Sequence, residues 1–402
     1  MRMSKKKEIV PKFRFPEFQR DGIDFVHGNK LFKSITNKNH NSDLPILAIT
    51  QDQGAVPRDQ IEYNITVTDK SLSNYKVVEV GDFIISLRSF QGGIEYSRFK
   101  GICSPAYIIL RKREENISEL YYKYFFKTWR YIQSLNRNLE GIRDGKMISY
   151  SQFSSVKVPY PRSFKEQQKI ADCLSSIDEL IDAENRKLKA LEKYKKGLMQ
   201  KLFPAEGKNL PEWRFPEFRG KSEWRIKPLG KICTNYDSRR IPITEKDRVK
   251  GEIPYIGASG VIDYINDFIF DEDLLCVSED GANLVARTYP IAFSISEKTW
   301  VNNHAHVLKF SHKYTQDIVE SYLNMINLQD FLTGMAQPKL NRAKLDIIPI
   351  PLPEEEEQQK IADCLSEVDK IITEQSNKVE QLKAHKKGLM QGLFPSLEEA
   401  DV

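Results

Sequence analysis

The sequence has few cysteines and no long apolar run, and both absences narrow the class of protein. Its 402 residues include five cysteines, an odd number, and none is in Cys-x-x-Cys spacing. Reduced thiols are therefore expected rather than a disulfide framework. No stretch approaches the roughly 18 apolar residues of a membrane span, and the start Met-Arg-Met-Ser-Lys-Lys-Lys is not followed by the apolar segment of a signal peptide. We expect a cytoplasmic protein with no membrane segment.

Motifs for three kinds of chemistry are incomplete. An N6-adenine methyltransferase needs Asp/Asn-Pro-Pro-aromatic, and the nearest run, Ser104-Pro-Ala-Tyr107, lacks the second proline. A phosphate-binding loop needs Gly-x-x-x-x-Gly-Lys-Ser/Thr; Gly220-Lys-Ser222 lacks the first glycine, and residues 141–146 are one residue too short. His304 and His306 alternate on an expected strand without an acidic or cysteine cluster, so a core or surface role is favoured over a metal site. The sequence therefore disfavours an adenine methyltransferase, a nucleotide-hydrolysing motor and a metal site on this chain.

One stretch of the sequence occurs twice. Residues 166–204 return as residues 357–395 at an offset of 191, and 23 of the 39 aligned positions are identical. Both copies open with Glu-Gln-Gln-Lys-Ile-Ala-Asp-Cys-Leu-Ser and close with Leu-Phe-Pro. A shorter motif, Pro-x-x-Arg-Phe-Pro-Glu-Phe, begins at Pro11 and again at Pro211. Self-similarity at so long a period indicates a duplicated unit that consists of a domain and a helix.

Within each copy, apolar residues recur at alternating spacings of four and three, which is typical of a helix that buries one narrow seam. Such a helix would be about 55 Å long. Because sixteen apolar side chains are costly to leave in water, we expect the two helices to pair as an antiparallel coiled coil. The alternative is that each helix packs on its own globular half. The predicted pairing residues are Ile170, Leu174, Ile177, Ile181, Leu188, Leu191, Leu198, Ile361, Leu365, Val368, Ile372, Val379, Leu382 and Leu389.

The remaining sequence predicts two mixed domains of the α/β (α+β) class. Each half offers runs of strand-forming residues followed by a helical pattern. The expected strands cover residues 75–80, 82–87, 106–110, 274–277, 290–295 and 305–310, and the expected helices cover 120–135 and 318–332. We therefore divide the chain into a first domain (1–165), a central helix (166–204), a second domain (205–356) and a C-terminal helix with its tail (357–402).

The net charge of +5 hides an asymmetry between the domains. Residues 1–165 carry 28 Lys and Arg against 17 Asp and Glu, or +11, whereas residues 205–356 carry 19 against 23, or −4. A basic first domain is typical of a protein with a polyanionic partner. The acidic second domain instead favours an alternative, a coiled-coil scaffold for protein interactions.

Taken together, these features closely resemble the specificity subunit of Type I restriction-modification systems. The resemblance rests on the two Glu-Gln-Gln-Lys-Ile-Ala helices, the proline-rich run Ile347-Ile-Pro-Ile-Pro-Leu-Pro353 and the loop Gln337-Pro-Lys-Leu-Asn341. It implies two target recognition domains in a pseudo-twofold repeat, each reading one half of a split site on double-stranded DNA. It also implies helices that set the spacer and dock two methylation subunits and two restriction and translocation subunits. S-adenosylmethionine, ATP and Mg would then be bound by those partners, and this chain would bind no cofactor.

Arginine pairs best with guanine and asparagine or glutamine with adenine, so loops rich in these residues are candidates for reading bases. The candidate DNA-binding residues are Arg88, Gln91, Arg143 and Lys146 in the first domain, and Arg239, Arg240, Asn283, Lys339, Asn341 and Arg342 in the second. A solvated loop without base contacts is an open alternative for each of them.

Overall fold

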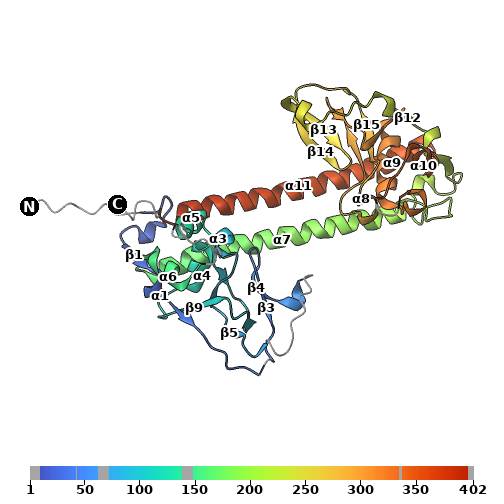
Figure 1. The fold of residues 1–402 in the computed structure, drawn as a ribbon. Helices are drawn as coiled ribbons and strands as arrows, with labels where there is room; N and C mark the ends of the chain where they lie inside the picture. The colour runs from blue at the N-terminus through green and yellow to red at the C-terminus, as the bar shows by residue number, and fades with distance from the viewer. Residues whose placement is uncertain (1–9, 42, 62–71, 138–147, 335–336, 397–402) are drawn as a thin grey trace, which may run out of the picture. The chain divides into compact units, whose positions relative to one another are not determined.

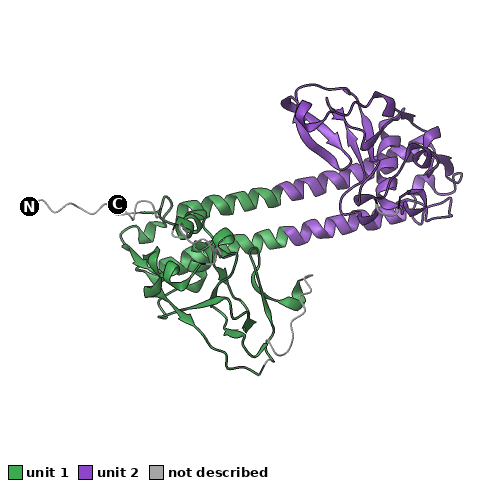
Figure 2. Ribbon diagram, viewed as in Figure 1, with its two compact units in different colours: residues 1–184, 378–402 green, residues 185–377 purple. Residues whose placement is uncertain are grey.

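The computed structural model describes residues 10–41, 43–61, 72–137, 148–334 and 337–396 (Figure 1). The chain divides into two compact units, of which unit 1 comprises residues 1–184 and 378–402, and unit 2 comprises residues 185–377. Figure 2 shows that both long helices, α7 (Phe164–Leu202) and α11 (Glu355–Leu393), pass from one unit to the other. Each unit therefore contains part of both helices.

Unit 1 is built on a four-stranded antiparallel sheet with the order β2-β9-β6-β7. Three further antiparallel pairs, β1–β10, β3–β4 and β5–β8, flank it in the chain. The strands are β1 Ile23–His27, β2 Phe32–Ile35, β3 Leu47–Thr50, β4 Gly54–Pro57, β5 Lys76–Val78, β6 Phe83–Ile85, β7 Glu95–Tyr96, β8 Gly101–Cys103, β9 Ile108–Lys112 and β10 Lys157–Pro161. The shorter helices are α1 Gly28–Leu31, α3 Ser89–Gly92, α4 Glu119–Phe125, α5 Trp129–Arg137 and α6 Tyr150–Ser155.

Unit 2 repeats this topology. Its sheet β12-β18-β15-β16 follows the order of the sheet in unit 1, and β11 pairs with β19 as β1 pairs with β10. The unit adds a three-stranded sheet, β14-β13-β17. The strands are β11 Arg225–Pro228, β12 Thr234–Asn235, β13 Lys250–Gly257, β14 Gly260–Ile265, β15 Leu274–Ser278, β16 Ala292–Ile295, β17 Trp300–Val301, β18 Ala305–Lys309 and β19 Pro349–Leu352, with helices α8 Asn283–Ala286, α9 Lys313–Met325 and α10 Arg342–Asp346. The duplication seen in the sequence thus extends to the sheets.

Both helices predicted within the domains differ from the structure: the first is interrupted, and the second has other bounds. The helix expected over 120–135 is two helices, α4 and α5, because the Thr128 hydroxyl donates to the Phe125 carbonyl at 2.7 Å and accepts from the Tyr131 amide. Such side-chain bonds compete with the helical ladder. The helix expected over 318–332 is wrong in both bounds, since α9 begins at Lys313 and ends at Met325. The next residues turn, with the Asn327 side chain accepting from the Gln329 amide at 3.0 Å.

Four consecutive or closely spaced aromatic residues of the first domain, within and just after α4, pack in its core. Tyr121, Tyr122, Phe125 and Phe126 are almost completely buried and meet Phe32 or one another at angles typical of aromatic packing. The core of unit 1 is completed by Ile170 and Leu174 of α7, by Leu393 of α11 and by Phe394, which follows α11. The core of unit 2 likewise takes Leu202 from α7, Phe203, which follows α7, and Ile361 and Leu365 from α11. Each sheet domain is therefore inseparable from the helix segments that cover it.

The long helices begin and end two residues earlier than the repeated sequence suggests. Pro204 and Pro395 disfavour helix in the residues before them, and the helices end at Leu202 and Leu393. Both continue through Gly197 and Gly388.

None of the fourteen predicted pairing residues is exposed: Ile170, Leu174, Ile181, Ile361, Leu365 and Val379 are buried, and the other eight are half-buried. No helix in the described part of the chain is apolar and long enough to cross a membrane.

Within each unit, ion pairs join the two long helices. In unit 1, Lys386 contacts Asp178 at 2.5 Å and Lys378 contacts Glu184 at 2.5 Å. Later residues of α11 thus pair with earlier residues of α7, so the segments run antiparallel. In unit 2, Lys195 contacts Asp369 at 2.5 Å. Because Lys195 and Asp369 are the repeat equivalents of Lys386 and Asp178, the same bridge is made once in each unit.

The short repeated motifs anchor each unit. We call residues 11–18 and 211–218 the anchor segments. In unit 1, Arg14 binds Glu166 near the start of α7, and the Phe13 amide donates to the Gly392 carbonyl at 2.8 Å at the end of α11. In unit 2, Arg214 binds Glu357, and an equivalent backbone bond joins residue 213 to residue 201 at 2.9 Å. Each anchor segment therefore ties the beginning of one long helix to the end of the other.

Candidate nucleic-acid interface

Three of the predicted loops in unit 2 lie together. We call residues 237–240, 278–283 and 338–342 the recognition segments. The Leu340 amide donates to the Glu279 carbonyl at 2.8 Å, and the Gly281 amide donates to the Pro338 carbonyl at 3.2 Å. Arg240 donates to the Glu279 carboxylate at 2.8 Å and so connects the first segment to the second. The sequence suggested each loop separately, and the structure brings all three to one place.

Arg239 is exposed and is held over aromatic rings. Its guanidinium lies 4.6 Å from the ring centre of Tyr236 and 4.8 Å from that of Phe270, and these two rings are stacked. It also contacts Glu272 at 3.1 Å. A guanidinium on aromatic faces keeps its plane oriented while its edge stays available. The two rings thus fix the plane of an exposed guanidinium, one nitrogen of which is engaged by Glu272.

The other exposed candidates of unit 2 lie on the third recognition segment. The Lys339 side chain is exposed while its backbone amide and carbonyl pair with Thr333 at 2.8 Å each. Asn341 caps α10 by accepting from the Lys344 amide at 3.0 Å. Arg342 begins α10 and contacts Asp346 at 3.6 Å. These side chains stand on a backbone that is fixed by hydrogen bonds.

Two candidates point inward instead. The Arg240 side chain is 12% exposed and is used by Glu279 and by the Ala305 carbonyl, at 2.7 Å. Asn283 is 8% exposed; it donates to the Tyr289 carbonyl and accepts from the Thr288 hydroxyl and amide. Since their hydrogen-bonding groups are used inside the domain, these two residues support the loops rather than present a free edge to DNA.

His306 lies beneath the recognition segments and is 1% exposed. Its Nδ1 is 2.6 Å from Asp237 Oδ2, and its Nε2 is 2.7 Å from the Leu340 carbonyl oxygen. The other Asp237 oxygen accepts from the Val307 amide at 2.9 Å. A second carboxylate, that of Glu279, lies 3.9 Å from Nδ1. One side chain of β18 therefore touches two of the recognition segments and approaches the third.

The charges of this cluster raise the pKa of His306 and lower the pKa of Asp237. Burial alone would lower the pKa of His306, but the hydrogen bond and charge of Asp237, the Leu340 carbonyl and Glu279 together raise it above the ordinary value. Burial alone would raise the pKa of Asp237, yet His306, the Val307 amide and Arg240 lower it. Burial raises the pKa of the neighbouring Cys276 thiol, which stays neutral. The cluster thus favours charged His306 beside charged Asp237.

In unit 1, the first predicted loop forms the short helix α3. Arg88 precedes it, Gln91 lies within it, and both are exposed. Helix α3 ends at Gly92 and is followed by Gly93. The φ of 82° at Gly93 and its closeness to the Phe126 carbonyl leave no room for a side chain, because an added Cβ would lie 2.2 Å from that oxygen. The Gln51 side chain donates to the Arg88 carbonyl at 3.3 Å. Arg143 and Lys146, the other candidates of this domain, lie outside the described residues.

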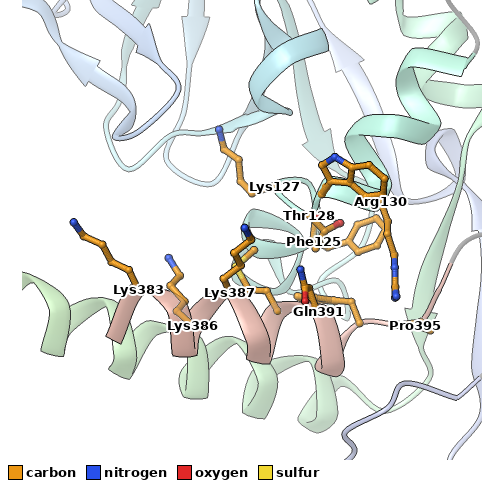
Figure 3. A pocket seen from close by; sticks show the side chains of 12 residues that line it. Phe125, Lys127, Thr128, Arg130, Lys383, Lys386, Lys387, Gln391 and Pro395 are labelled. Atoms are coloured by element: carbon orange, nitrogen blue, oxygen red, sulfur yellow. Dashed lines mark hydrogen bonds between the residues drawn. The ribbon is translucent and has the colours of Figure 1, made fainter. Parts of the chain in front are cut away.

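A pocket of about 650 Å³ in unit 1 lies beside the end of α11 (Figure 3). Its α11 side carries Lys386, Lys387, Met390 and Gln391, and the opposite side is formed by residues 125–130, including the exposed Trp129. Unit 2 has a pocket of about 580 Å³ that uses the repeat equivalents Lys195, Lys196, Met199 and Gln200 of α7. The two pockets thus share four identical residues on one edge, although Lys383 on the edge of the first corresponds to Glu192 in the second, and the opposite edges differ.

Sequence reasoning missed the supporting network and the role of the anchor segments. Asp237 is not among the predicted site residues, and its bond to His306 joins residues 69 positions apart. The signal for the anchor segments was present, since the motif is repeated, but repetition alone does not show what Arg14 binds. Among the described residues, no group of three His, Cys, Asp or Glu side chains is arranged to hold a metal ion.

Comparison with known proteins agrees with this architecture. The family model for the Type I restriction modification DNA specificity domain matches the chain twice, at residues 21–193 and 221–383. Together these matches cover most of the chain, with one copy beginning in each sheet domain and extending into the long helix that follows it. The chain belongs to this family of DNA specificity proteins of Type I restriction-modification systems.

Individual relatives share the family at lower identity. The chain is 25% identical to the type I restriction enzyme MjaVIII specificity subunit of Methanocaldococcus jannaschii over 351 residues, which are 81% of this chain and 80% of that protein. It is 33% identical to a specificity subunit of Haemophilus influenzae over 153 residues, but this match spans only 38% of this chain and 39% of that protein.

Solved structures share the fold. The Type-I restriction-modification system S subunit from M. genitalium matches with a TM-score of 0.59 and 15% identity, over 96% of this chain and 99% of that one. A second chain, from a study of complex assembly and conformational transition of the type I system, matches with a TM-score of 0.56 over 93% of this chain and 98% of its own length.

Proposed function

We propose that this chain reads a bipartite DNA site, with each sheet domain reading one half. In this proposal residues 1–165 and 205–356 are the two target recognition domains, and residues 166–204 and 357–402 carry the long helices that connect them. The observation that supports it most is that both units repeat one sheet order and one anchor while their loops differ. A constant frame with unlike loops is what two different half-sites require.

The side chains proposed to contact DNA are those that the frame leaves exposed. They are Arg88 and Gln91 in the first domain and Arg239, Lys339, Asn341 and Arg342 in the second. Arg143 and Lys146 belong to the proposal from the sequence alone. The basic first domain would supply more of the phosphate contacts, which give affinity without sequence preference.

The long helices are proposed to set the spacer between half-sites and to dock the partner subunits. The antiparallel ion pairs within each unit support a coiled coil. The pockets with the shared Lys-Lys-x-x-Met-Gln edge support two docking positions for one kind of partner, such as two methylation subunits. Methylation with S-adenosylmethionine, and ATP- and Mg-dependent translocation and cleavage by two motor subunits, would then occur on those partners in the cytoplasm, and this chain would be non-catalytic.

Methylation-sensitive sequencing of DNA modified by the reconstituted complex tests the proposal. The expected result is one bipartite motif with an unread spacer. Exchange of residues 205–356 for those of a relative should replace one half of the motif and keep the other.

Arg239→Ala should relax one position of the second half-site by about 1–3 kcal/mol of discrimination. Arg225→Ala is the matched control, since Arg225 is an exposed arginine of β11 that contacts Glu354.

The alternative of a protein-interaction scaffold has one observation in its favour, the net negative charge of residues 205–356. A mobility-shift experiment with a random duplex pool, with and without a methylation subunit, separates the two functions. Binding of no duplex under either condition, together with no methylated motif, would favour the scaffold.

A further inference from the structure

Three recognition segments converge on a single buried side chain. His306 is bound through both ring nitrogens, by the first segment at Asp237 and by the third at the Leu340 carbonyl. The second segment joins them indirectly, because Glu279 accepts from Arg240 through its side chain and from the Leu340 amide through its carbonyl. No other histidine in the described part of unit 2 has both ring nitrogens in such bonds: His304 contacts Asp280 through Nδ1 and is half exposed, and His312 stacks on Tyr314.

The geometry defines the protonation state of the ring. A carbonyl oxygen can only accept, so Nε2 must carry a proton. Asp237 already accepts from the Val307 amide through one oxygen, and as a carboxylate it accepts from Nδ1 through the other. Both nitrogens therefore donate, and the ring is an imidazolium.

The surrounding charges balance only in this state. Two carboxylates, Asp237 and Glu279, face two cations, Arg240 and His306, in a region where the side chains of Asp237, Arg240 and His306 are at most 12% exposed. Two cysteines also interact with Asp237, and burial raises the pKa of both Cys276 and Cys233, so both are neutral thiols. Loss of the His306 proton would leave one uncompensated negative charge and would turn a ring lone pair toward Asp237 or Leu340. Such a mismatch inside a protein is costly.

We infer that protonated His306 is a positioning residue that holds the segments bearing Arg239 and Lys339 in the arrangement that reads the second half-site. The inference rests on the proposed function and adds to it a pH-dependent specificity confined to one half of the site. The matching strand of unit 1, β9 (Ile108–Lys112), contains no histidine, so the first half-site has no equivalent of His306.

The direction of the pH effect follows from linkage. The folded-state pKa of His306 is raised above its ordinary value, so the stabilisation is complete below about pH 6.5 and is lost as the pH rises through the higher folded value. Discrimination at the second half-site should therefore weaken as the pH rises.

The experiment uses the full chain in complex with its methylation subunit. Once methylation sequencing has identified the motif, affinities are measured from about pH 6 to about pH 8.5 for duplexes with the complete site, a scrambled first half-site or a scrambled second half-site. The measurements are made in a Glu95→Gln background, because Glu95 of unit 1 titrates in the same range. We expect preference for the correct second half-site to fall by about tenfold, the effect of one lost charged hydrogen bond, and preference for the first to stay constant. An equal fall at both half-sites, or no fall at either, would overturn the inference.

Two variants sharpen the result. His306→Gln is uncharged at every pH, so it should discriminate weakly at the second half-site and show no further dependence on pH. His312→Gln, a change at an exposed histidine of the same unit, should keep the wild-type profile. A His306→Gln complex that retains the wild-type pH profile would contradict the role of His306.

Amide hydrogen exchange in the free full-length chain provides a readout without DNA. After correction for the intrinsic effect of pH, protection of the Leu340 and Gly281 amides should fall with rising pH relative to amides of β15. Unchanged protection would overturn the positioning role. A chain that shows this loss of protection but yields no methylated motif and binds no duplex would contradict the proposed function instead, and with it the role of His306 in reading DNA.

Discussion

Arg14 and Glu166 form a two-point ion pair that is almost completely buried, with Nε 2.7 Å from one carboxylate oxygen and Nη2 2.9 Å from the other. Their side chains are 6% and 0% exposed. Arg214 and Glu357 repeat the arrangement in unit 2 at 2.7 and 2.6 Å. A buried pair of this kind specifies how two segments meet, because each charge is unfavourable without the other.

Arg14→Met should therefore destabilise unit 1 by about 3–5 kcal/mol, since it leaves the Glu166 carboxylate buried without its partner. Hydrogen exchange measured by mass spectrometry across a denaturant series would report each unit separately. The double variant Arg14→Met/Glu166→Met should recover most of the loss, because both charges are then absent. Lys169→Ala is the control: its pair with Glu17 is about half exposed, and a change of less than about 1 kcal/mol is expected.

Alanine substitutions at two glycines four residues apart on α11 should change the stability of the protein in opposite directions. At Gly388 an added Cβ meets nothing within 4 Å, so Gly388→Ala should stabilise the helix by about 1 kcal/mol. At Gly392 the same atom would lie 2.1 Å from the Phe13 ring, so Gly392→Ala should displace the anchor segment and destabilise unit 1 by about 1–3 kcal/mol. Thermal unfolding of both variants checks the signs. Gly197→Ala, at the repeat equivalent of Gly388, should also be stabilising.

Glu95 should make the stability of unit 1 depend on pH. Burial raises its pKa to about 7 despite the nearby charge of Lys127. The folded state then holds the proton more tightly than the unfolded state, so the free energy of unfolding should fall as the pH rises from about 4.5 to about 7. In Glu95→Gln this contribution is absent, and the difference between the two proteins should change across that window. A constant difference would show that the pKa of Glu95 is the same in the folded and unfolded states.

The proposed spacer function predicts a change of site when both long helices are lengthened. One heptad is inserted between Glu184 and Leu188 and another between Gln375 and Val379, which lie at matching depth because Glu184 contacts Lys378. Seven residues add about 10 Å, or about three base pairs. The bases read in each half should stay the same while the spacer lengthens.

Loss of all activity in this variant has a separate explanation, because three base pairs also rotate one half-site by about 100° relative to the other. Insertion in α7 alone, which shifts the pairing register, is the matched control and should prevent assembly. Full methylation at the original spacer by the doubly lengthened protein would contradict the proposal that the helices set the spacing.

Local patterns in the sequence were sufficient to predict much of the fold. The spacing of apolar residues predicted both long helices, and Pro204 and Pro395 explain why each ends two residues before the repeated motif does. Runs of strand-forming residues identified β6, β9, β15 and β18 within a few residues. The breaks after Phe125 and Met325 were not predicted, because they depend on single side chains, those of Thr128 and Asn327, that bond to nearby backbone.

The candidate interface was predictable only as a set of loops. Arg239 and Arg240 are adjacent in the sequence, yet the turn at Asp237–Arg239 directs the first toward solvent and the second toward Glu279. Asn283 has the right chemistry for adenine, but its amide is used by Thr288 and Tyr289. The partners of His306 come from positions 237 and 340, and no periodicity in the sequence records such distant contacts.

The composition of unit 1 has a consequence for biosynthesis. Its core includes Leu393 and Phe394, and the Phe394 ring lies 5.1 Å from Tyr121 and 5.6 Å from Phe125. The ribosome therefore has to reach residue 394 before unit 1 can close its core, whereas every residue of unit 2 is present once residue 377 has been added. We expect the later-translated unit to fold first, and the nascent amino-terminal domain to wait, with its aromatic side chains incompletely covered, for the last helix to arrive.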